Sequence, residues 1–578
     1  MAKFVLETSP FFVRLTSTFQ LYNFMKHFIS LIVLASLAVA SAYADTRSDK
    51  EMLGIARNAF AHPTSADNNI KRQAVRQVNI QKLMSSSEFN VYGSKSEGFV
   101  IVSRDDNFAP VLGYSSSEFD ADKIPCGLKW WMNATDASLA NMRAEGKTFQ
   151  KTATRAAEGD YLLQSTWGQT GAFADKTPGK CPSGCVATAM SQIMYYYKYP
   201  ASASFDGSYK YGGTFEEYPV KSTYNWGRMI NSYTGNYNVL QKNAVSTLLR
   251  DAGYATAMQY GSNGSGTYDY LAARAFGHAF QYDSLSVNYY SRTFYSDDEW
   301  MAIIKSSIEA KTPVFYGGAT DANEGHAFVL DGINADGMVH VNWGWDGEAN
   351  GWFYIDHLGS AAYGEYNNSQ DMICGMRATS ASQQGAENKS QWGVMELSLS
   401  VNPDGTLHNS NFYLYNLSQR DFKGNTYLVL ENTTTHKTYS SLLTSEKDFG
   451  TVGCLNGVSL KEGDYLLEDL ELPAGDYEMY FVSQSDNESK QVRFRKEGGE
   501  AVYPLTISAD GKVSGSYPTT GIATVETNGK LSGNSVDVYN LQGQKVLHTK
   551  SSGFNTDALK PGSVYIVRSG GQSKKIIK

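Results

Sequence analysis

The chain has 578 residues, which is enough for three or four domains of about 100–200 residues each. Its formal net charge of -8 at pH 7 argues against a nucleic-acid partner, which needs a basic surface. Five cysteines are too few and too scattered for a disulfide scaffold, and because their number is odd, at least one thiol is unpaired in an exported protein. They are Cys126, Cys181, Cys185, Cys374 and Cys454.

The N-terminal region, residues 1–44, contains the pattern of a secretory signal. A short basic segment precedes the apolar run Phe28–Val39, and small residues ending at Ala44 form a cleavage site. This run is shorter than the roughly 20 residues that a spanning helix needs. We therefore expect export without a stable transmembrane segment in the mature form, with Met25 as the true start.

Residues 45–155 are expected to form a separate N-terminal domain. Polar helical segments surround one clear predicted strand, Gly98–Ser103. The stretch Met142–Gly159 carries Lys147, Lys151 and Arg155 without apolar periodicity, which indicates an accessible linker. Residues 156–380 then hold most of the residues of chemical interest.

A cysteine lies where a glycine-broken loop turns into a predicted amphipathic helix, at Gly184-Cys185. The apolar positions that follow keep the three-and-four spacing of one buried face: Val186, Ala189, Met190, Ile193, Met194 and Tyr197. Unpaired backbone N–H groups and the helix dipole in the first turn stabilise a thiolate. Cys185 is thus either a nucleophile or a small buried apolar residue.

A nucleophilic thiol needs an imidazole, and of the four histidines in this segment we favour His326. The runs 326–333 and 338–345, joined by the turn Asn334–Gly337, have the pattern of a β-hairpin. We expect Ile333 to pair with Met338, which places His326, Phe328, Trp343 and Trp345 on one face. His326 then has an aromatic wall.

The same register places Asp331 opposite His340, so His340 is expected to be a structural histidine. A register slip of one residue would instead bring Asn342 beside His326. The Cys185 and His326 pair indicates acyl transfer: thiolate attack on a carbonyl, proton donation to the leaving amine, and hydrolysis of the thioester.

The C-terminal part is expected to be β-rich. Residues 390–519 contain short alternating strands, Phe412–Tyr415, Tyr427–Leu430 and Tyr477–Val482, which predict an immunoglobulin-like β-sandwich. Residues 520–578 predict another small β module.

Four ordered blocks give the chain its resemblance to a known family. They are Gly184–Ala189, Gln192–Met194, Gly325–Val329 and His340–Trp345. In these blocks the chain resembles the streptopain and interpain family of secreted papain-like cysteine peptidases, over roughly residues 80 to 378. The resemblance implies an α+β fold: a papain-like catalytic domain preceded by an α+β propeptide and followed by β-sandwich modules.

The resemblance also implies roles for individual residues. Cys185 would be the nucleophile and His326 the general acid and base, with Trp343 in place of the asparagine that orients the histidine in papain. Trp345 would be a packing tryptophan. Gln169 would donate to the oxyanion together with the backbone N–H of Cys185, although a surface glutamine is the alternative.

For substrate binding, the glycine-rich stretch 260–267 resembles the loop that receives an extended peptide, with Ser265 preferred over Ser262 at the family position. Gly325 would also let substrate approach the backbone. Phe89–Tyr92 and Gly98–Ser103 resemble the inhibitory propeptide, which implies a zymogen with its own propeptide as inhibitor and with cleavage within 147–155.

The last module resembles type IX secretion sorting domains through Tyr539–Gly543 and Val564–Val567. It implies the type IX machinery as a partner and a location outside the cell or on the outer-membrane surface of a Gram-negative bacterium. Protein or peptide substrates are expected, with no cofactor.

Two other interpretations remain open from the sequence. Cys181 and Cys185 could be metal ligands or a redox pair, although no second cysteine pair of metal-binding spacing occurs. The chain could also be a catalytically inactive papain-like domain that serves as a surface binding or adhesion protein.

Overall fold

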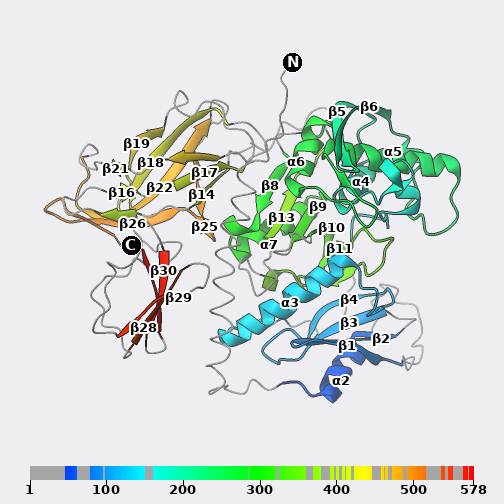
Figure 1. Cartoon of the computed structure of the whole chain (residues 1–578), viewed down its shortest axis with the longest axis horizontal. Helices are drawn as coiled ribbons and strands as arrows, with labels where there is room; N and C mark the ends of the chain where they lie inside the picture. The colour runs from blue at the N-terminus through cyan, green and yellow to red at the C-terminus, as the bar shows by residue number, and fades with distance from the viewer. Residues whose placement is uncertain are drawn as a thin grey trace.

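The structure is a computed structural model, shown in Figure 1. It describes residues 46–60, 79–94, 98–149, 151, 160–283, 286–319, 325–358, 369–378, 391–395, 399–401, 407–409, 412–417, 422–444, 457–460, 463–465, 471–485, 491–496, 498–515, 535–540, 545–550, 564–569 and 572–577. The expected signal segment and its start at Met25 lie outside these residues. No helix in the described ranges has the length and apolar character needed to cross a membrane.

The N-terminal region is a small antiparallel sheet with two helices. Its elements are α2 (Asp49–Phe60), β1 (Gln81–Ser85), β2 (Phe89–Ser94), β3 (Gly98–Ser103), β4 (Val111–Ser115) and α3 (Cys126–Ala144). The predicted strand Gly98–Ser103 is confirmed as β3, and all six of its residues are buried. Helix α3 continues to Ala144, so the first residues of the expected linker belong to its last turn.

The central region combines helices with the strands from β12 to β8 at one end of a large sheet and with a separate three-stranded sheet. Its helices are α4 (Cys185–Tyr197), α5 (Val239–Ala255), α6 (Asp269–His278), α7 (Asp297–Glu309) and the 3-10 turns η1 (Gly171–Ala174), η2 (Pro178–Lys180), η3 (Trp226–Arg228), η4 (Arg292–Phe294) and η5 (Asp356–Leu358). Its strands are β5 (Ser202–Tyr211), β6 (Thr214–Thr223), β7 (Gln259–Tyr260), β8 (Asn288–Ser291), β9 (Val314–Ala319), β10 (Gly325–Ile333), β11 (Val339–Asn342), β12 (Gly351–Phe353) and β13 (Ser369–Cys374).

One ten-stranded sheet joins the N-terminal and central regions. Its strand order is β1-β2-β3-β4-β12-β11-β10-β9-β13-β8, and the junction is the antiparallel pair of β4 and β12. Helix α3 runs along this junction (Figure 1) and packs against β10. The two regions therefore share one hydrophobic core, which includes Trp131 and Phe353, with ring centroids 5.0 Å apart.

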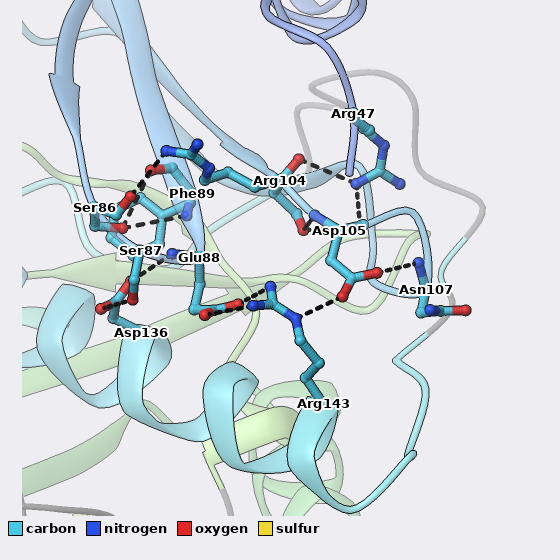
Figure 2. A network of polar contacts seen from close by, with 11 residues as sticks. Arg47, Ser86, Ser87, Glu88, Phe89, Arg104, Asp105, Asn107, Asp136 and Arg143 are labelled. Atoms are coloured by element: carbon cyan, nitrogen blue, oxygen red, sulfur yellow. Dashed lines mark hydrogen bonds and ion pairs between the residues drawn. The ribbon is translucent and has the colours of Figure 1, made fainter. Parts of the chain in front are cut away.

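A buried ion-pair network fixes the far end of α3 to the N-terminal sheet (Figure 2). The Arg143 guanidinium donates to Glu88 Oε1 at 3.0 Å and to Asp105 Oδ2 at 2.8 Å. Both carboxylates are almost fully buried. Asp136, which lies on α3 seven residues before Arg143, accepts from the backbone N–H of Glu88 at 2.9 Å. These contacts hold the helix in one orientation relative to the sheet.

The C-terminal part is β-rich, as expected. The strands before residue 515 are β14 (Trp392–Met395), β15 (Leu399–Val401), β16 (Leu407–Asn409), β17 (Phe412–Asn416), β18 (Gly424–Asn432), β19 (Thr438–Thr444), β20 (Gly457–Leu460), β21 (Gly463–Tyr465), β22 (Gly475–Ser485), β23 (Val492–Arg493), β24 (Arg495–Lys496), β25 (Gly499–Glu500), β26 (Val502–Ile507) and β27 (Val513–Ser514). They form a five-stranded, a three-stranded and a six-stranded sheet, and residues of the five-stranded and six-stranded sheets share a second hydrophobic core. The final strands, β28 (Ser535–Asn540), β29 (Lys545–Lys550), β30 (Val564–Ser569) and β31 (Gln572–Ile577), form a four-stranded sheet. The α+β class expected from the sequence is confirmed.

The first C-terminal module is attached to the central region through Arg495. Its guanidinium donates to Glu299 Oε1 at 2.6 Å and to the carbonyl of Phe294 at 2.8 Å, and it lies 4.1 Å from the ring centroid of Tyr295. These contacts lie on η4, on Tyr295 and on α7, and none of these carries Cys185 or His326.

Candidate active site

Cys185 is the first residue of α4, as the amphipathic pattern predicts. Gly184 caps the helix with a φ of 87°, a conformation that side chains other than glycine rarely adopt. A Cβ at Gly184 would also lie 2.8 Å from the Met258 side chain and 3.0 Å from the carbonyl oxygen of Ser265. The glycine therefore lets the helix start close to the 260–267 loop. Cys185 itself is partly buried.

His326 lies near the start of β10, with only 4% of its surface exposed. Its Nε2 atom is 2.7 Å from the backbone carbonyl oxygen of Trp343. A carbonyl can only accept, so Nε2 carries a proton, and Nδ1 is the nitrogen left to exchange a proton with a neighbour. This Nδ1 atom faces thiol groups.

The Cys185 thiol and the His326 imidazole hydrogen-bond and shift each other's pKa. Burial is the largest single effect and raises the pKa of Cys185, but the hydrogen bond and charge of His326, together with backbone hydrogen bonds, lower this pKa overall. Backbone N–H groups of Ala327 and Val186 add to this effect. Burial would lower the pKa of His326, yet the Cys126 and Cys185 thiols together raise it well above its usual value. Both shifts favour a thiolate and imidazolium pair.

Two tryptophans enclose His326. The Trp345 ring stacks on the imidazole with centroids 5.9 Å apart and planes at 14°. Trp343 is fully buried against Phe328, 4.8 Å between centroids, and its indole N–H donates to the carbonyl of Ala349 at 2.9 Å. The aromatic face expected around His326 is confirmed.

The predicted hairpin register is correct at one end and wrong at the other. Val329 pairs with Asn342, as expected, but Ile333 pairs with Val339 and not with Met338. A bulge between Leu330 and Gly332 adds a residue and shifts the pairing toward the turn by one. The bulge leaves the His326 end of the hairpin in the expected register.

His340 and Asn342 contact groups other than His326. His340 Nδ1 lies 2.6 Å from Asp331 Oδ1, so the expected structural pair is confirmed despite the bulge. The Asn342 amide donates to the carbonyl of Ser165 at 2.7 Å, and its oxygen accepts from Gln192 of α4 at 3.1 Å. The group that contacts His326 Nε2 is thus the Trp343 carbonyl.

The remaining expected residues lie around Cys185. Gln169 is 5% exposed, and its carbonyl accepts from the N–H of Ser183 at 2.8 Å, so its loop packs against the loop that leads into α4. Ser265 lies with its carbonyl facing Gly184, and its hydroxyl accepts from the N–H of Gly261 at 3.4 Å. Gly325 is exposed at the start of β10, next to His326.

Cys126 is a site residue that the sequence analysis did not predict. Cys126 is the first residue of α3, and its Sγ atom is 3.1 Å from His326 Nδ1. The next residue, Gly127, is buried so tightly that an added Cβ would lie 2.5 Å from the His326 ring and 2.6 Å from Trp343. Trp130 lies across Gly318 and against Phe328 on the same face. Helix α3 therefore covers the histidine.

Gln192 is a second residue whose position was missed. It accepts from the Ser165 hydroxyl at 2.9 Å and from the N–H of Trp167 at 3.1 Å, and it donates to Asn342. The buried amide pair of Gln192 and Asn342 links the helix that carries Cys185 to the strand that leads into Trp343. The one sequence feature that pointed to Gln192 was its place in the block Gln192–Met194, which resembles the streptopain and interpain family.

The other cysteines in the described ranges are also free thiols. Cys181 and Cys374 are buried, and no disulfide joins them to Cys126 or Cys185. Within those ranges, no group of three or more His, Cys, Asp or Glu side chains could hold a metal ion. Cys454 lies outside the described residues.

Comparisons with known families cover both the N-terminal and the central regions. Residues 167–353 match the Peptidase C10 family, and residues 44–139 match the Spi protease inhibitor family. The first range contains Cys185 and His326, and the second contains Cys126.

Individual relatives match the same part of the chain. Over 391 residues it is 31% identical to the thiol protease/hemagglutinin PrtT of Porphyromonas gingivalis, a match that covers 60% of this chain and 44% of that protein. It is 29% identical to streptopain of Streptococcus pyogenes over 390 residues, covering 60% of this chain and 97% of streptopain. The chain thus spans less than half the length of the Porphyromonas relative.

Among solved structures, a fragment of prointerpain A from Prevotella intermedia is 32% identical, with 52% of this chain and 99% of the fragment covered and a TM-score of 0.47. The active interpain A cysteine protease of the same organism is 34% identical, with 38% and 95% covered and a TM-score of 0.34.

Proposed function

We propose that the chain is a zymogen of a cysteine endopeptidase, which hydrolyses peptide bonds once its N-terminal inhibitor-like domain is removed, because residues 167–353 match the Peptidase C10 family and residues 44–139 match the Spi protease inhibitor family. The observation that carries the proposal is the His326 imidazole, whose Nδ1 faces thiols and whose Nε2 is held by the Trp343 carbonyl. A fixed tautomer and a lowered thiol pKa are what thiol acyl transfer requires.

In the proposed reaction, the Cys185 thiolate attacks the carbonyl carbon of the scissile bond. The His326 imidazolium then donates the Nδ1 proton to the leaving amine, which departs as the thioester forms. Neutral His326 next takes a proton from water as the water oxygen attacks the thioester carbonyl. The C–S bond then breaks, the peptide leaves with a new C-terminal carboxyl group, and the thiolate and imidazolium pair is restored. Each step needs the imidazole plane to stay fixed, and the Trp343 carbonyl and the Trp345 ring hold it.

Gln169 is the proposed side-chain donor to the oxyanion, together with the backbone N–H of Cys185. The Cys185 N–H lies in the first turn of α4 and has no partner within the helix. The Gln169 carbonyl accepts a hydrogen bond from the N–H of Ser183, which precedes Cys185 by two residues in the chain. This bond holds the loop that carries Gln169 next to the start of α4. Preorganised donors of this kind stabilise the charge that develops on the carbonyl oxygen.

Ser265 and Gly325 are the proposed substrate-binding positions on either side of Cys185, with Trp345 as the packing wall. Ser265 lies beside Gly184, and Gly325 lies directly before His326 at the exposed start of β10. Backbone groups at both positions are close enough to Cys185 to pair with an extended peptide.

Latency is proposed to come from α3. Cys126 occupies the His326 Nδ1 position that the leaving amine must reach, and Gly127 packs on the same ring. The Arg143 network holds the other end of the helix against the N-terminal sheet. Cleavage within 147–155 would separate this domain from the enzyme.

We further propose the domain limits and route of export. Residues 1–44 carry the signal, 45–155 the inhibitory propeptide, 156–380 the catalytic domain, 390–519 the sandwich and 520–578 the sorting domain. The four-stranded sheet of β28 to β31 gives the last module a folded unit of its own. We infer recognition by the type IX machinery and release outside the cell or onto the surface of a Gram-negative bacterium.

The alternative of an inactive binding protein predicts a damaged site. Cys185 and His326 are instead both present and in contact, with Trp343 and Trp345 around them. This arrangement favours the enzyme.

The full-length protein tests the proposal. Cys185→Ala should abolish peptide hydrolysis and leave the purified protein unprocessed, whereas Cys181→Ala, which removes a buried thiol four residues away, should process and hydrolyse normally. Activity in Cys185→Ala, or activity that requires a chelatable metal, would overturn the thiol mechanism. Spontaneous conversion of Cys185→Ala to a fragment starting near Arg155 would rule out self-cleavage.

A further inference from the structure

Two carboxyl groups from distant parts of the chain meet beside Cys185 and His326. Asp269 is the first residue of α6, directly after the glycine-rich loop, and Asp371 is in the middle of β13. Both lie over Gly317 of β9, where an added Cβ would collide with Oδ2 of Asp269 and approach Oδ1 of Asp371 to 2.5 Å. The absence of a side chain at Gly317 is what lets the carboxyls approach each other.

The sheet register connects this pair to the nucleophile. Ala327 pairs with Gly317, and Gly317 pairs with Asp371, so the three positions form one row across β10, β9 and β13 and face the same side. The backbone N–H of Ala327 hydrogen-bonds Cys185 at one end of the row. Strands are about 4.8 Å apart, so the carboxyls over Gly317 lie one strand from the thiol position.

The pair lacks a compensating cation among the described residues that contact it. Asp371 Oδ2 accepts from the Tyr289 hydroxyl at 2.8 Å, whereas its buried Oδ1 has no hydrogen-bond partner in the described ranges. Burial and then the Asp371 charge raise the pKa of Asp269 well above its usual value, and burial raises that of Asp371 to about 6. Two carboxyls in this setting share one proton.

The thioester mechanism uses neither carboxyl. Asp269 is close enough to Cys185 and His326 for their charges to affect its pKa. Leaving a charge uncompensated beside a reaction centre costs free energy that a cationic ligand would recover. A substrate side chain is the available source of such a cation.

We propose that Asp269 and Asp371 make this enzyme select substrates with lysine or arginine two residues before the scissile bond. An extended peptide advances about 3.3 Å per residue and alternates its side chains between two faces. The second residue before the scissile bond lies about 7 Å along the peptide from the carbonyl that Cys185 attacks. At this distance its side chain can point along the row from Ala327 to Gly317, toward the two carboxyls. This inference rests on the proposed peptidase function.

The test uses the activated protein and two fluorogenic peptides that differ only at the second residue before the cut, arginine in one and its neutral isostere citrulline in the other. Wild type should cleave the arginine peptide with a kcat/KM about tenfold or more above that of the citrulline peptide. The double variant Asp269→Asn, Asp371→Asn, which removes the one negative charge that the pair carries, should reduce this ratio severalfold. Asp206→Asn, which removes an exposed carboxyl on β5, should leave the ratio unchanged.

The outcomes separate this inference from the proposed function. Equal rates for the two peptides in wild type, or an unchanged ratio in the double variant, would overturn the selection while leaving the peptidase intact. A preference for arginine at another position would overturn it as well. If neither peptide is cleaved and E-64, a reagent that labels active-site thiols, does not label Cys185, the proposed function itself fails.

The pH dependence of the ratio provides a second readout. The titratable groups that face the pair are Tyr289 on β8, Tyr316 on β9, Cys185 on α4 and His326 on β10. Cys185 and His326 act on both peptides alike, so their titration cancels in the ratio. Because protonation of Asp371 below about pH 6 removes the negative charge, the arginine preference should be lost as the pH falls through this value. A ratio that stays constant from pH 5 to pH 8 would contradict the role of the pair.

Discussion

Two helices in this chain begin with a cysteine, and both cysteines contact the same imidazole. Cys126 starts α3 in the N-terminal domain, and Cys185 starts α4 in the central region. Their surroundings differ. Backbone N–H groups of Val186 and Ala327 hydrogen-bond the Cys185 thiol, whereas Cys126 is exposed and has no side-chain cap before it, only Pro125.

The comparison teaches that a helix start alone does not make a cysteine a nucleophile. A reactive thiol also needs backbone donors, an imidazole with a fixed tautomer and a place for the oxyanion. Cys185 has all three in the proposed mechanism. Of these three features Cys126 has only the contact with the imidazole, so it can bind the Nδ1 atom of His326 without acting as a nucleophile.

We expect the largest loss of activity from a substitution of Gln169, because its loop contacts the segment that leads into Cys185 and serves the proposed oxyanion site of this thiol. Gln169→Ala should lower kcat by about 10²–10³ with little change in KM, since an oxyanion donor acts mainly in the transition state. Steady-state kinetics on the activated protein measure the split. Labelling of Cys185 by E-64 at a near-normal level would show that the variant is folded. A loss confined to KM would assign Gln169 to substrate binding.

A smaller effect is expected where α3 meets the histidine. Gly127→Ala adds a methyl group in contact with His326 and Trp343, and overpacking of this kind costs about 1–3 kcal/mol. The helix should seat less well, so E-64 should label Cys185 in the unprocessed protein about tenfold faster.

The matched control for this variant is Gly54→Ala on α2, where an added Cβ meets nothing within 4 Å. Labelling should stay slow in Gly54→Ala. Equally slow labelling in Gly127→Ala would mean that α3 does not restrict the active site.

The smallest predicted change is a shift in a pH profile. The lowered pKa of Cys185 keeps the thiolate present at a pH where an ordinary thiol is protonated, and the main favourable cause is His326. In the activated protein, His326→Ala should therefore move the rise of the iodoacetamide reaction rate to higher pH. His278→Ala, which changes an exposed histidine on α6, should not move it. Superimposable profiles for His326→Ala and wild type would contradict the ion pair.

Features that depend on local periodicity could be predicted from the sequence. Strand β3 and helix α4 follow directly from apolar spacing, and the hairpin register at Val329 follows from alternation. The bulge at Asp331 could not be predicted, because one inserted residue leaves both apolar patterns intact. The aromatic face around His326 survived this error because the bulge lies on the turn side.

Features that depend on distant contacts were not accessible to pattern analysis. Cys126 and His326 are 200 residues apart in the sequence, and nothing in the local pattern of either indicates the other. The pairing of β4 with β12, which places α3 over the site, is equally non-local. Asp269 and Asp371 meet only because Gly317 lacks a side chain between them.

In the proposed zymogen, Cys185 alone is the nucleophile and helix α3 restrains it until the N-terminal domain is removed. The most direct measurement is titration of the protein with E-64 before and after removal of the N-terminal domain, with the labelled peptide identified by mass spectrometry. We expect slow labelling before removal, and afterwards one equivalent of label on Cys185 with loss of all peptidase activity. Label on Cys126, Cys181 or Cys374, or full activity with Cys185 labelled, would contradict it.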